Sequence, residues 1–171
     1  MTPGRLVVLE LSRMEATHLA GLVTQFAELL DETGEGLPDD PAVLRLVPDA
    51  YADDAEAARE FRGLTQRELL ERRSADAGAV LATLAEAVDL SVDGNDPADS
   101  EAALVETTLI RLGPDDLQAW LRTLAAVRLV LASRLGITHE DDHVDDDPRF
   151  GVYDWIGYRL DGLVRAADGD D

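Results

Sequence analysis

The residues best equipped for chemistry form one run, residues 139–143, with the sequence His-Glu-Asp-Asp-His. Two histidines four residues apart with a glutamate between them match H-E-x-x-H, in which both imidazoles bind zinc from one helical face and the glutamate acts as base. Here the run follows Gly136, a residue that ends helices, and continues into three aspartates and Pro148, which disfavour a helix. No histidine follows as a third ligand. We therefore expect no zinc hydrolase at this site.

The same segment leaves a second metal chemistry open, because its carboxylates are dense. A loop rich in oxygen ligands can hold a divalent cation without a helix. Its candidate ligands are His139, Glu140, His143 and Asp145. A metal-dependent enzyme or a cation-binding protein using residues 139–147 is therefore the alternative to a solvated acidic loop.

Another acidic segment, residues 89–95, follows the first half of a calcium-binding loop. It places acids at positions one and five and glycine at position six. The second half departs from the pattern, since position eight is Asp96 and position twelve is Ser100, and Pro97 intrudes. We expect no EF-hand here.

Three arginines, Arg122, Arg128 and Arg134, recur every six residues in an apolar segment. At roughly 100° per residue, six positions advance the side chain by about 240°, so the three point in different directions and form no phosphate-binding stripe. Arg128 lies in the most apolar part of this segment, and a buried guanidinium requires an anionic partner. We expect a structural role for it, with Asp154 as its partner.

Elements that position these residues can be read from hydrophobic periodicity and from capping residues. Ser12 and Glu15 form a capping box, as do Thr65 and Glu68, and Gly136 is suited to a left-handed helix cap. The expected elements are strands over 5–11 and 104–112 and helices over 13–33, 41–47, 55–62, 66–88, 114–135 and 150–165.

This pattern predicts a mainly α fold, a single-domain helical bundle with a minor two-stranded β-sheet. The whole chain, residues 1–171, is expected to form one domain with an ordered core over about 5–166 and an acidic tail over 167–171. The two strands are expected to pair, because a lone strand leaves its backbone groups unsatisfied.

Composition narrows the functional classes. The 171 residues carry a formal net charge of −21 and no cysteine. Such a field repels phosphate backbones and anionic membranes, so direct nucleic-acid binding and membrane binding are not expected. It favours a protein partner with a basic surface. Absence of cysteine excludes disulfides and thiol chemistry. We expect a cytoplasmic protein that needs no cofactor.

Several motifs together resemble a known family. They are residues 46–54 (Leu-Val-Pro-Asp-Ala-Tyr-Ala-Asp-Asp), residues 60–65, residues 120–122 with 128–136, and Asp147-Pro148 with residues 153–158. The chain is similar across 5–164 to the actinobacterial domain of unknown function 2017 family, also described as oxidative-stress transcriptional regulators. The resemblance implies a cytoplasmic regulator acting through protein contacts, with a sigma factor as a candidate partner. Thiol-based redox sensing is not carried over, because this chain has no cysteine.

Residues and resemblance together lead to the expectation of a non-enzymatic regulatory or adaptor protein. Its candidate contact residues are the loop acids Asp145, Asp146 and Asp147 and the aromatic residues Tyr153 and Trp155. A small-molecule binding module with Trp120, Tyr153 and Trp155 lining a pocket is a third hypothesis. The sequence leaves the oligomeric state open, a homodimer included.

Overall fold

The computed structural model describes residues 4–33, 40–47, 55–89 and 105–169. These form a mainly helical domain with a two-stranded antiparallel sheet, which confirms the expected fold class. In chain order the elements are β1 (Val7–Ser12), α1 (Arg13–Glu32), α2 (Pro41–Leu44), α3 (Ala55–Asp89), β2 (Thr107–Leu112), α5 (Pro114–Leu135), the 3₁₀ turns η1 (Glu140–Asp142) and η2 (Pro148–Phe150), and α6 (Gly151–Asp168).

Strands from distant parts of the chain form the sheet. The antiparallel register pairs Val7 with Leu112 and Leu9 with Ile110. Side chains alternate between the two faces of a strand, so these four residues share the face that is turned to the helices. The opposite face carries exposed apolar side chains, including Leu109, which is 58% exposed.

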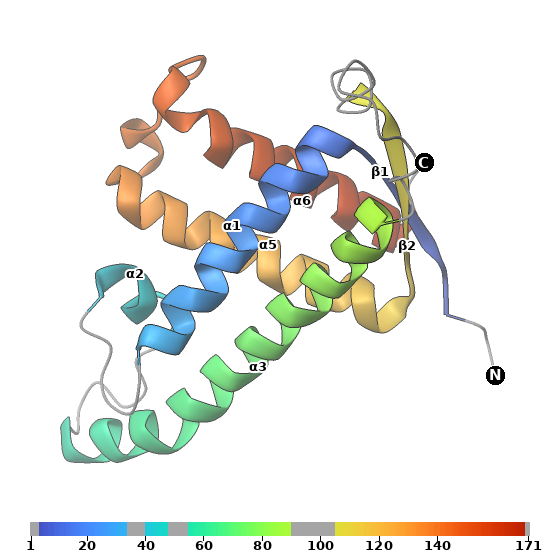
Figure 1. The fold of residues 1–171 in the computed structure, drawn as a ribbon. Helices are drawn as coiled ribbons and strands as arrows, with labels where there is room; N and C mark the ends of the chain where they lie inside the picture. Colours follow the sequence, from blue (N-terminus) through green and yellow to red (C-terminus); the bar gives the residue numbers. More distant parts are fainter. Residues whose placement is uncertain (1–3, 34–39, 48–54, 90–104, 170–171) are drawn as a thin grey trace.

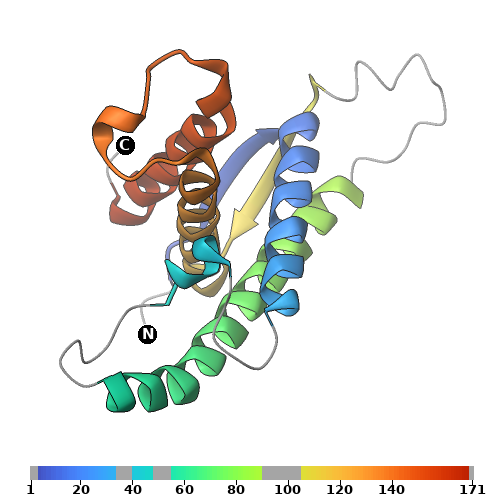
Figure 2. The same ribbon diagram turned by 90° about the vertical axis from the view of Figure 1, so that its left-hand side faces the viewer.

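The helices pack around α5. Helix α3 contacts α1 and α5, and α5 also contacts α6. Figure 2 shows α5 and α6 on one side, α1 and α3 on the other, and the sheet behind, between the two helix pairs. In Figure 1 the sheet lies at one end of the bundle and α2 at the other. Trp120 on α5 is completely buried in the core, where its indole N–H donates to the Thr83 hydroxyl at 2.9 Å.

Two predicted caps fix the ends of the helices that frame the fold. The Glu15 N–H donates to the Ser12 hydroxyl at 3.1 Å, and the Ser12 N–H donates to the Glu15 carboxylate at 2.9 Å, which confirms the capping box. Gly136 has φ = 73°, the left-handed conformation that glycine adopts without a Cβ clash, and it ends α5. The loop that follows therefore leaves the helix at a defined angle.

One prediction about the helices is wrong. Residues 55–89 form a single helix, whereas the second capping box predicted a new start at Thr65. A buried stripe that includes Gln66, Leu70, Ala77 and Val80 follows this point, and its apolar members belong to the core. This burial stabilises the helix after Thr65, and a glycine inside a helix, here Gly63, costs only about 1 kcal/mol, so the helix can continue through both positions. The calcium-like segment lies, beyond Asp89, outside the described residues.

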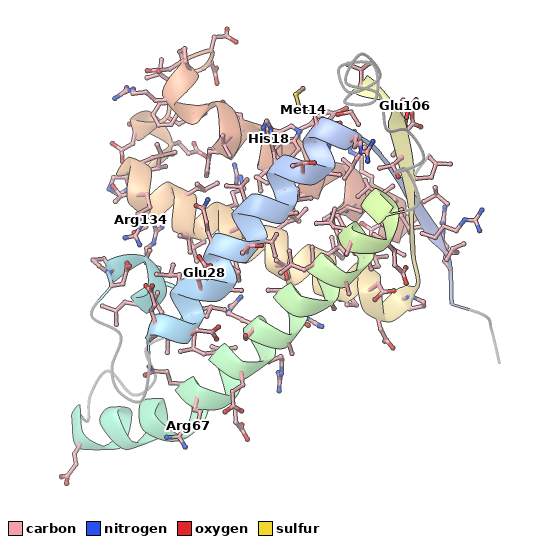
Figure 3. All side chains as sticks on the ribbon, viewed as in Figure 1. Met14, His18, Glu28, Arg67, Glu106 and Arg134 are labelled. Carbon is pink, nitrogen blue, oxygen red and sulfur yellow. The ribbon has the colours of Figure 1, made fainter. Side chains whose placement is uncertain are left out.

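Ion pairs connect the helices at their ends. Arg134 at the end of α5 donates to both oxygens of Asp40 at 2.9 and 2.5 Å, while Asp40 also caps α2. Hydrogen bonding from Arg134 lowers the pKa of Asp40 below its usual value. Other charged side chains, such as Glu28 and Arg67, point away from the core (Figure 3). Among the described residues, no helix has the length and apolar character that crossing a membrane requires.

Candidate functional site

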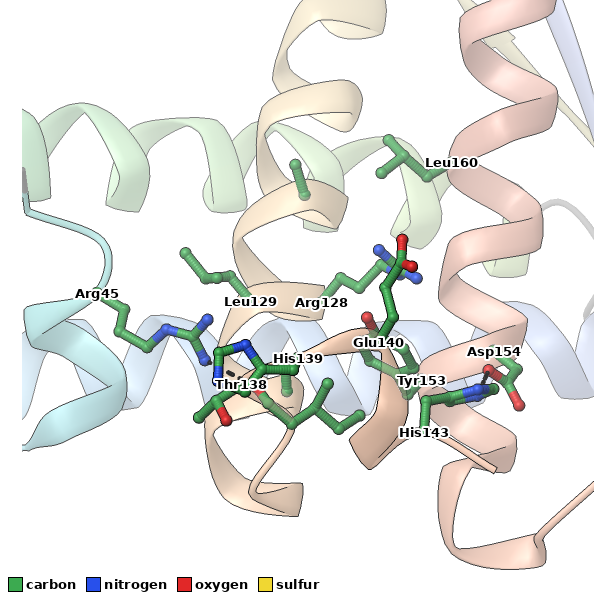
Figure 4. A pocket seen from close by; sticks show the side chains of 13 residues that line it. Arg45, Arg128, Leu129, Thr138, His139, Glu140, His143, Tyr153, Asp154 and Leu160 are labelled. Atoms are coloured by element: carbon green, nitrogen blue, oxygen red, sulfur yellow. Dashed lines mark hydrogen bonds and ion pairs between the residues drawn. The ribbon is translucent and has the colours of Figure 1, made fainter. Parts of the chain in front are cut away.

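A cleft of about 510 Å³ opens beside the loop that joins α5 to α6 (Figure 4). Its walls come from the second half of α5, from the loop after Gly136, from α6, and from Arg45 at the end of α2. It is lined by Arg45, Ala125, Arg128, Leu129, Ala132, Ile137, Thr138, His139, Glu140, His143, Tyr153, Asp154 and Leu160. The cleft thus brings together three of the four candidate metal ligands and both residues of the expected ion pair.

The H-E-x-x-H run lies outside an α-helix, as the sequence predicted. Residues 140–142 form a single 3₁₀ turn, and Asp142 holds it by accepting hydrogen bonds from the Thr138 N–H at 2.9 Å, the Thr138 hydroxyl at 2.8 Å and the His139 N–H at 2.9 Å. These hydrogen bonds lower the pKa of Asp142. Figure 4 shows His139 near Arg45 and His143 near Asp154, at different ends of the cleft.

No group of three or more histidine, aspartate or glutamate side chains within the described ranges is arranged to hold a metal ion. His143 instead braces the loop against α6. Its Nε2 lies 2.7 Å from an Asp154 carboxylate oxygen, and its ring packs near the rings of Phe150 and Tyr153. Asp145 lies 3.6 Å from the His143 Nδ1, and its side chain is 97% exposed.

The expected ion pair between Arg128 and Asp154 is not formed, and Asp154 instead contacts His143 through one carboxylate oxygen. The Arg128 guanidinium carbon lies 4.1 Å from the centre of the Tyr153 ring, a cation–π arrangement. Its Nε is buried without a hydrogen-bond partner. Within the described part of the chain, no carboxylate forms a salt bridge with it. The sequence placed Arg128 correctly in a partly buried environment but gave it the wrong partner.

Because of this arrangement, removing Arg128 should affect stability much less than breaking a buried ion pair would. Substitution Arg128→Met should change the free energy of unfolding by about 1 kcal/mol or less, since the lost cation–π contact of about 0.5–2 kcal/mol is offset by removal of a desolvated charge. Urea denaturation measures it. Arg159→Met is the comparison, since Arg159 pairs with Glu15 at 2.5 Å, and it should destabilise more. A loss of about 3–5 kcal/mol in Arg128→Met would indicate a hidden ionic partner.

The three candidate contact aspartates differ in what they do. Asp145 and Asp146 are exposed, and Asp146 adopts φ = 63°, a conformation that aspartate and asparagine tolerate better than most residues. Asp147 caps the η2 turn by accepting from the Arg149 N–H at 3.0 Å, and it pairs with the Arg149 guanidinium at 2.9 Å. These contacts lower the pKa of Asp147. Asp147 is therefore engaged in the loop structure, whereas the other two face solvent.

The aromatic candidates are both half-buried, and only one lines the cleft. Tyr153 lies in the cleft wall beneath Arg128. The Trp155 indole N–H points to the other side of α6 and donates to Glu15 at 3.2 Å. Trp120 is in the core. The hypothesis of one pocket lined by all three aromatic residues is therefore wrong.

A contact that sequence reasoning missed fixes the position of α6 and hence of one cleft wall. Glu15, the capping-box acid of α1, accepts hydrogen bonds from Arg159 at 2.5 Å and from Trp155. Partial desolvation raises the pKa of Glu15, but the bonds from Arg159, the Ser12 N–H and Trp155 outweigh it and lower that pKa to about 2. The capping box was visible in the sequence, whereas a partner 144 residues away was not.

Comparison with known proteins gives a family without an assigned function. No curated protein and no solved structure shows significant similarity to the chain. The pattern of one family, described as a domain of unknown function, matches residues 1–167, which include every element of the cleft. The chain therefore belongs to the DUF2017 family.

Proposed function

We propose that this chain is a non-enzymatic regulatory or adaptor protein of the cytoplasm. It acts through protein–protein contacts, and its partner meets the acidic loop between α5 and α6 with a basic surface. A sigma factor in stress-responsive transcription, in an actinobacterial host, is the partner to test first. The observation that carries the proposal is a structurally fixed loop whose remaining acids face solvent.

The loop is fixed by its own side chains. Asp142 closes the 3₁₀ turn, His143 bonds to Asp154, and Asp147 pairs with Arg149. These contacts engage His143, one of the candidate metal ligands, and two aspartates of the loop. They support a binding role, because a pre-ordered surface loses little conformational entropy when it binds.

The acids that are left project outward. Glu140, Asp141 and Asp146 are exposed and form no ion pair within the described residues, and Asp145 is almost fully exposed. A cluster of like charges steers a complementary partner and raises the association rate more than it lowers the dissociation rate. The alternative, a divalent-cation-dependent enzyme using residues 139–147, lacks a metal-ligand grouping in the described part of the chain.

The association rate with a purified sigma factor tests the proposal. The double variant Asp145→Asn, Asp146→Asn should slow association roughly three- to tenfold and change the dissociation rate little. Asparagine keeps the volume and tolerates the left-handed backbone of Asp146, and Asp147 stays intact because it caps η2. Stopped-flow or surface-based kinetics would give both rates.

Rising salt should slow the wild-type association as well, because the Debye length falls from about 10 Å at 0.1 M to about 3 Å at 1 M. The matched control is Glu68→Gln, Glu71→Gln, which removes two exposed charges from α3, and it should retain near wild-type kinetics. Equal rates for all three proteins, unaffected by salt, would show that the acidic loop serves solubility alone.

A further inference from the structure

We propose that the cleft binds a small organic anion, with the Arg128 guanidinium anchoring its carboxylate or phosphate group. The ligand class is a molecule of metabolite size with one oxyanion and a mainly apolar body. This inference does not depend on the identity of any protein partner.

Among the described residues, the charge of Arg128 is not matched by a carboxylate. The sequence has 36 acidic residues and 15 arginines, so carboxylates outnumber guanidinium groups more than two to one. The other two arginines of α5 form salt bridges with carboxylates, Arg122 with Asp76 at 2.8 Å and Arg134 with Asp40 at 2.5 Å. Arg128, on the same helix and less exposed than either, has no such partner among the described residues. A partly buried guanidinium without a counter-charge is costly, and an external anion would supply that charge.

Helix α6 leaves space for this guanidinium. It lies against the face of Tyr153 on one side. Gly157, one helical turn later on α6, also lies close to it: a Cβ atom there would be 3.0 Å from the Arg128 Nε and 3.4 Å from its Nη2. The absence of a side chain at Gly157 therefore admits the arginine. A ring and a glycine at positions i and i+4 hold the guanidinium in one orientation, which is the preorganisation that anion recognition requires.

The cleft has a volume and walls that suit a small ligand. Its volume of about 510 Å³ falls in the range of small-molecule sites, about 300–1,000 Å³. Apolar walls come from Ala125, Leu129, Ala132, Ile137 and Leu160. Figure 4 shows Arg128 between α5 and α6 beside Tyr153, while Arg45 points toward His139 at the other end. An apolar body would lie along the α5 wall, with the oxyanion at Arg128.

Acidic groups in the cleft limit the charge of the ligand. Asp154 lines the cleft, but His143 contacts its carboxylate at 2.7 Å. Glu140 is exposed, lies on the 3₁₀ turn, and forms no ion pair with Arg128 in this structure. Because Glu140 also lines the cleft, its negative charge would compete with a bound anion for the guanidinium. These carboxylates favour a ligand with a single anionic group over a polyanion.

Titration with simple probes tests the site in the full chain at 0.15 M NaCl. Benzoate presents a carboxylate, phenyl phosphate presents a phosphate, and benzyl alcohol has a similar body without charge. At least one of the two anions should bind at least about tenfold more tightly than benzyl alcohol, because hydrogen bonds to charged groups are the stronger ones. Which of the two anions binds shows whether the site prefers a carboxylate or a phosphate group. In NMR spectra the amide shifts should concentrate at Thr138, Tyr153 and Gly157.

Variants locate the anchor. Arg128→Gln should weaken the anion at least about tenfold, and Glu140→Gln should strengthen it by removing the competing carboxylate. Gly157→Ala keeps every charge but crowds the Arg128 Nε, so it should also weaken binding. Gly162→Ala is the matched control on the same helix, since a Cβ there meets nothing within 4 Å, and it should bind like wild type.

Three results would overturn the proposal. They are the absence of binding by both anions, equal affinity for benzyl alcohol, and unchanged anion affinity in both Arg128→Gln and Gly157→Ala. Folding does not confound the last comparison, because an alanine in place of a helical glycine favours the helix by up to about 1 kcal/mol, and Gly162→Ala controls for that gain.

Discussion

Substitution Trp120→Ala is expected to lower the free energy of unfolding by about 3–5 kcal/mol, the usual loss when a large buried aromatic side chain is removed. Trp120 is 0% exposed and lies on α5, the helix that contacts α1, α3 and α6. Its loss would leave a cavity between α5 and α3 and would leave the Thr83 hydroxyl without the indole donor. Urea denaturation followed by circular dichroism gives the free energy directly.

Two control variants help to interpret this loss of stability. Trp120→Phe removes the indole N–H but keeps most of the volume, so it should cost clearly less than the alanine variant. Gln118→Ala changes an exposed residue on the same helix and should alter stability by about 0.5 kcal/mol or less. A Trp120→Ala protein within 1 kcal/mol of wild type would show that α5 is not the centre of the core.

Acidification should remove a second large contribution, that of Glu15. Its pKa is lowered from 4.5 to about 2, so the folded state holds the ionised carboxylate more strongly than the unfolded chain does. A lowered folded-state pKa gives stability that is fully present above about pH 4.5 and is lost as the pH falls toward 2. Because one pKa unit corresponds to about 1.36 kcal/mol, this contribution is at most about 3 kcal/mol.

The variant Glu15→Gln isolates that contribution. It should be less stable than wild type at pH 7, and the difference should shrink between pH 4.5 and 2 as wild type loses its ionised carboxylate. Glu28→Gln, on an exposed position of the same helix, should keep the wild-type pH dependence. If Glu15→Gln followed the wild-type curve at a constant offset, the contact between α1 and α6 would not depend on charge.

Local signals predicted the elements that frame the cleft. The capping box of Ser12 and Glu15, the left-handed Gly136 and the β-branched residues before Leu112 each act over a few residues, and the structure confirms the elements they define. The position of residues 139–143 outside an α-helix followed from Gly136 on one side and Pro148 on the other. Such features are encoded where they occur, so a single sequence reveals them.

Local sequence signals did not show which side chains contact each other across the fold. Arg128 was expected to pair with Asp154. Instead the Asp154 carboxylate contacts His143, eleven residues earlier in the sequence, and the Arg128 guanidinium stacks on the Tyr153 ring. The contact between Glu15 and Arg159 joins the two ends of the chain. Helix α3 continues through the second capping box, where Thr65 and Glu68 favoured a new start. These outcomes depend on how helices pack, and packing is set by the whole chain.

We propose the loop between α5 and α6 as the contact surface for a protein partner. Hydrogen exchange of the chain, free and bound to a sigma factor, tests it most directly. We expect new protection over residues 139–147, with little change along the exposed face of α3. Two results would contradict it: no complex at all, or protection confined to the exposed apolar positions around Tyr158 on α6 or Leu109 on β2, since the contact would then be apolar rather than acidic.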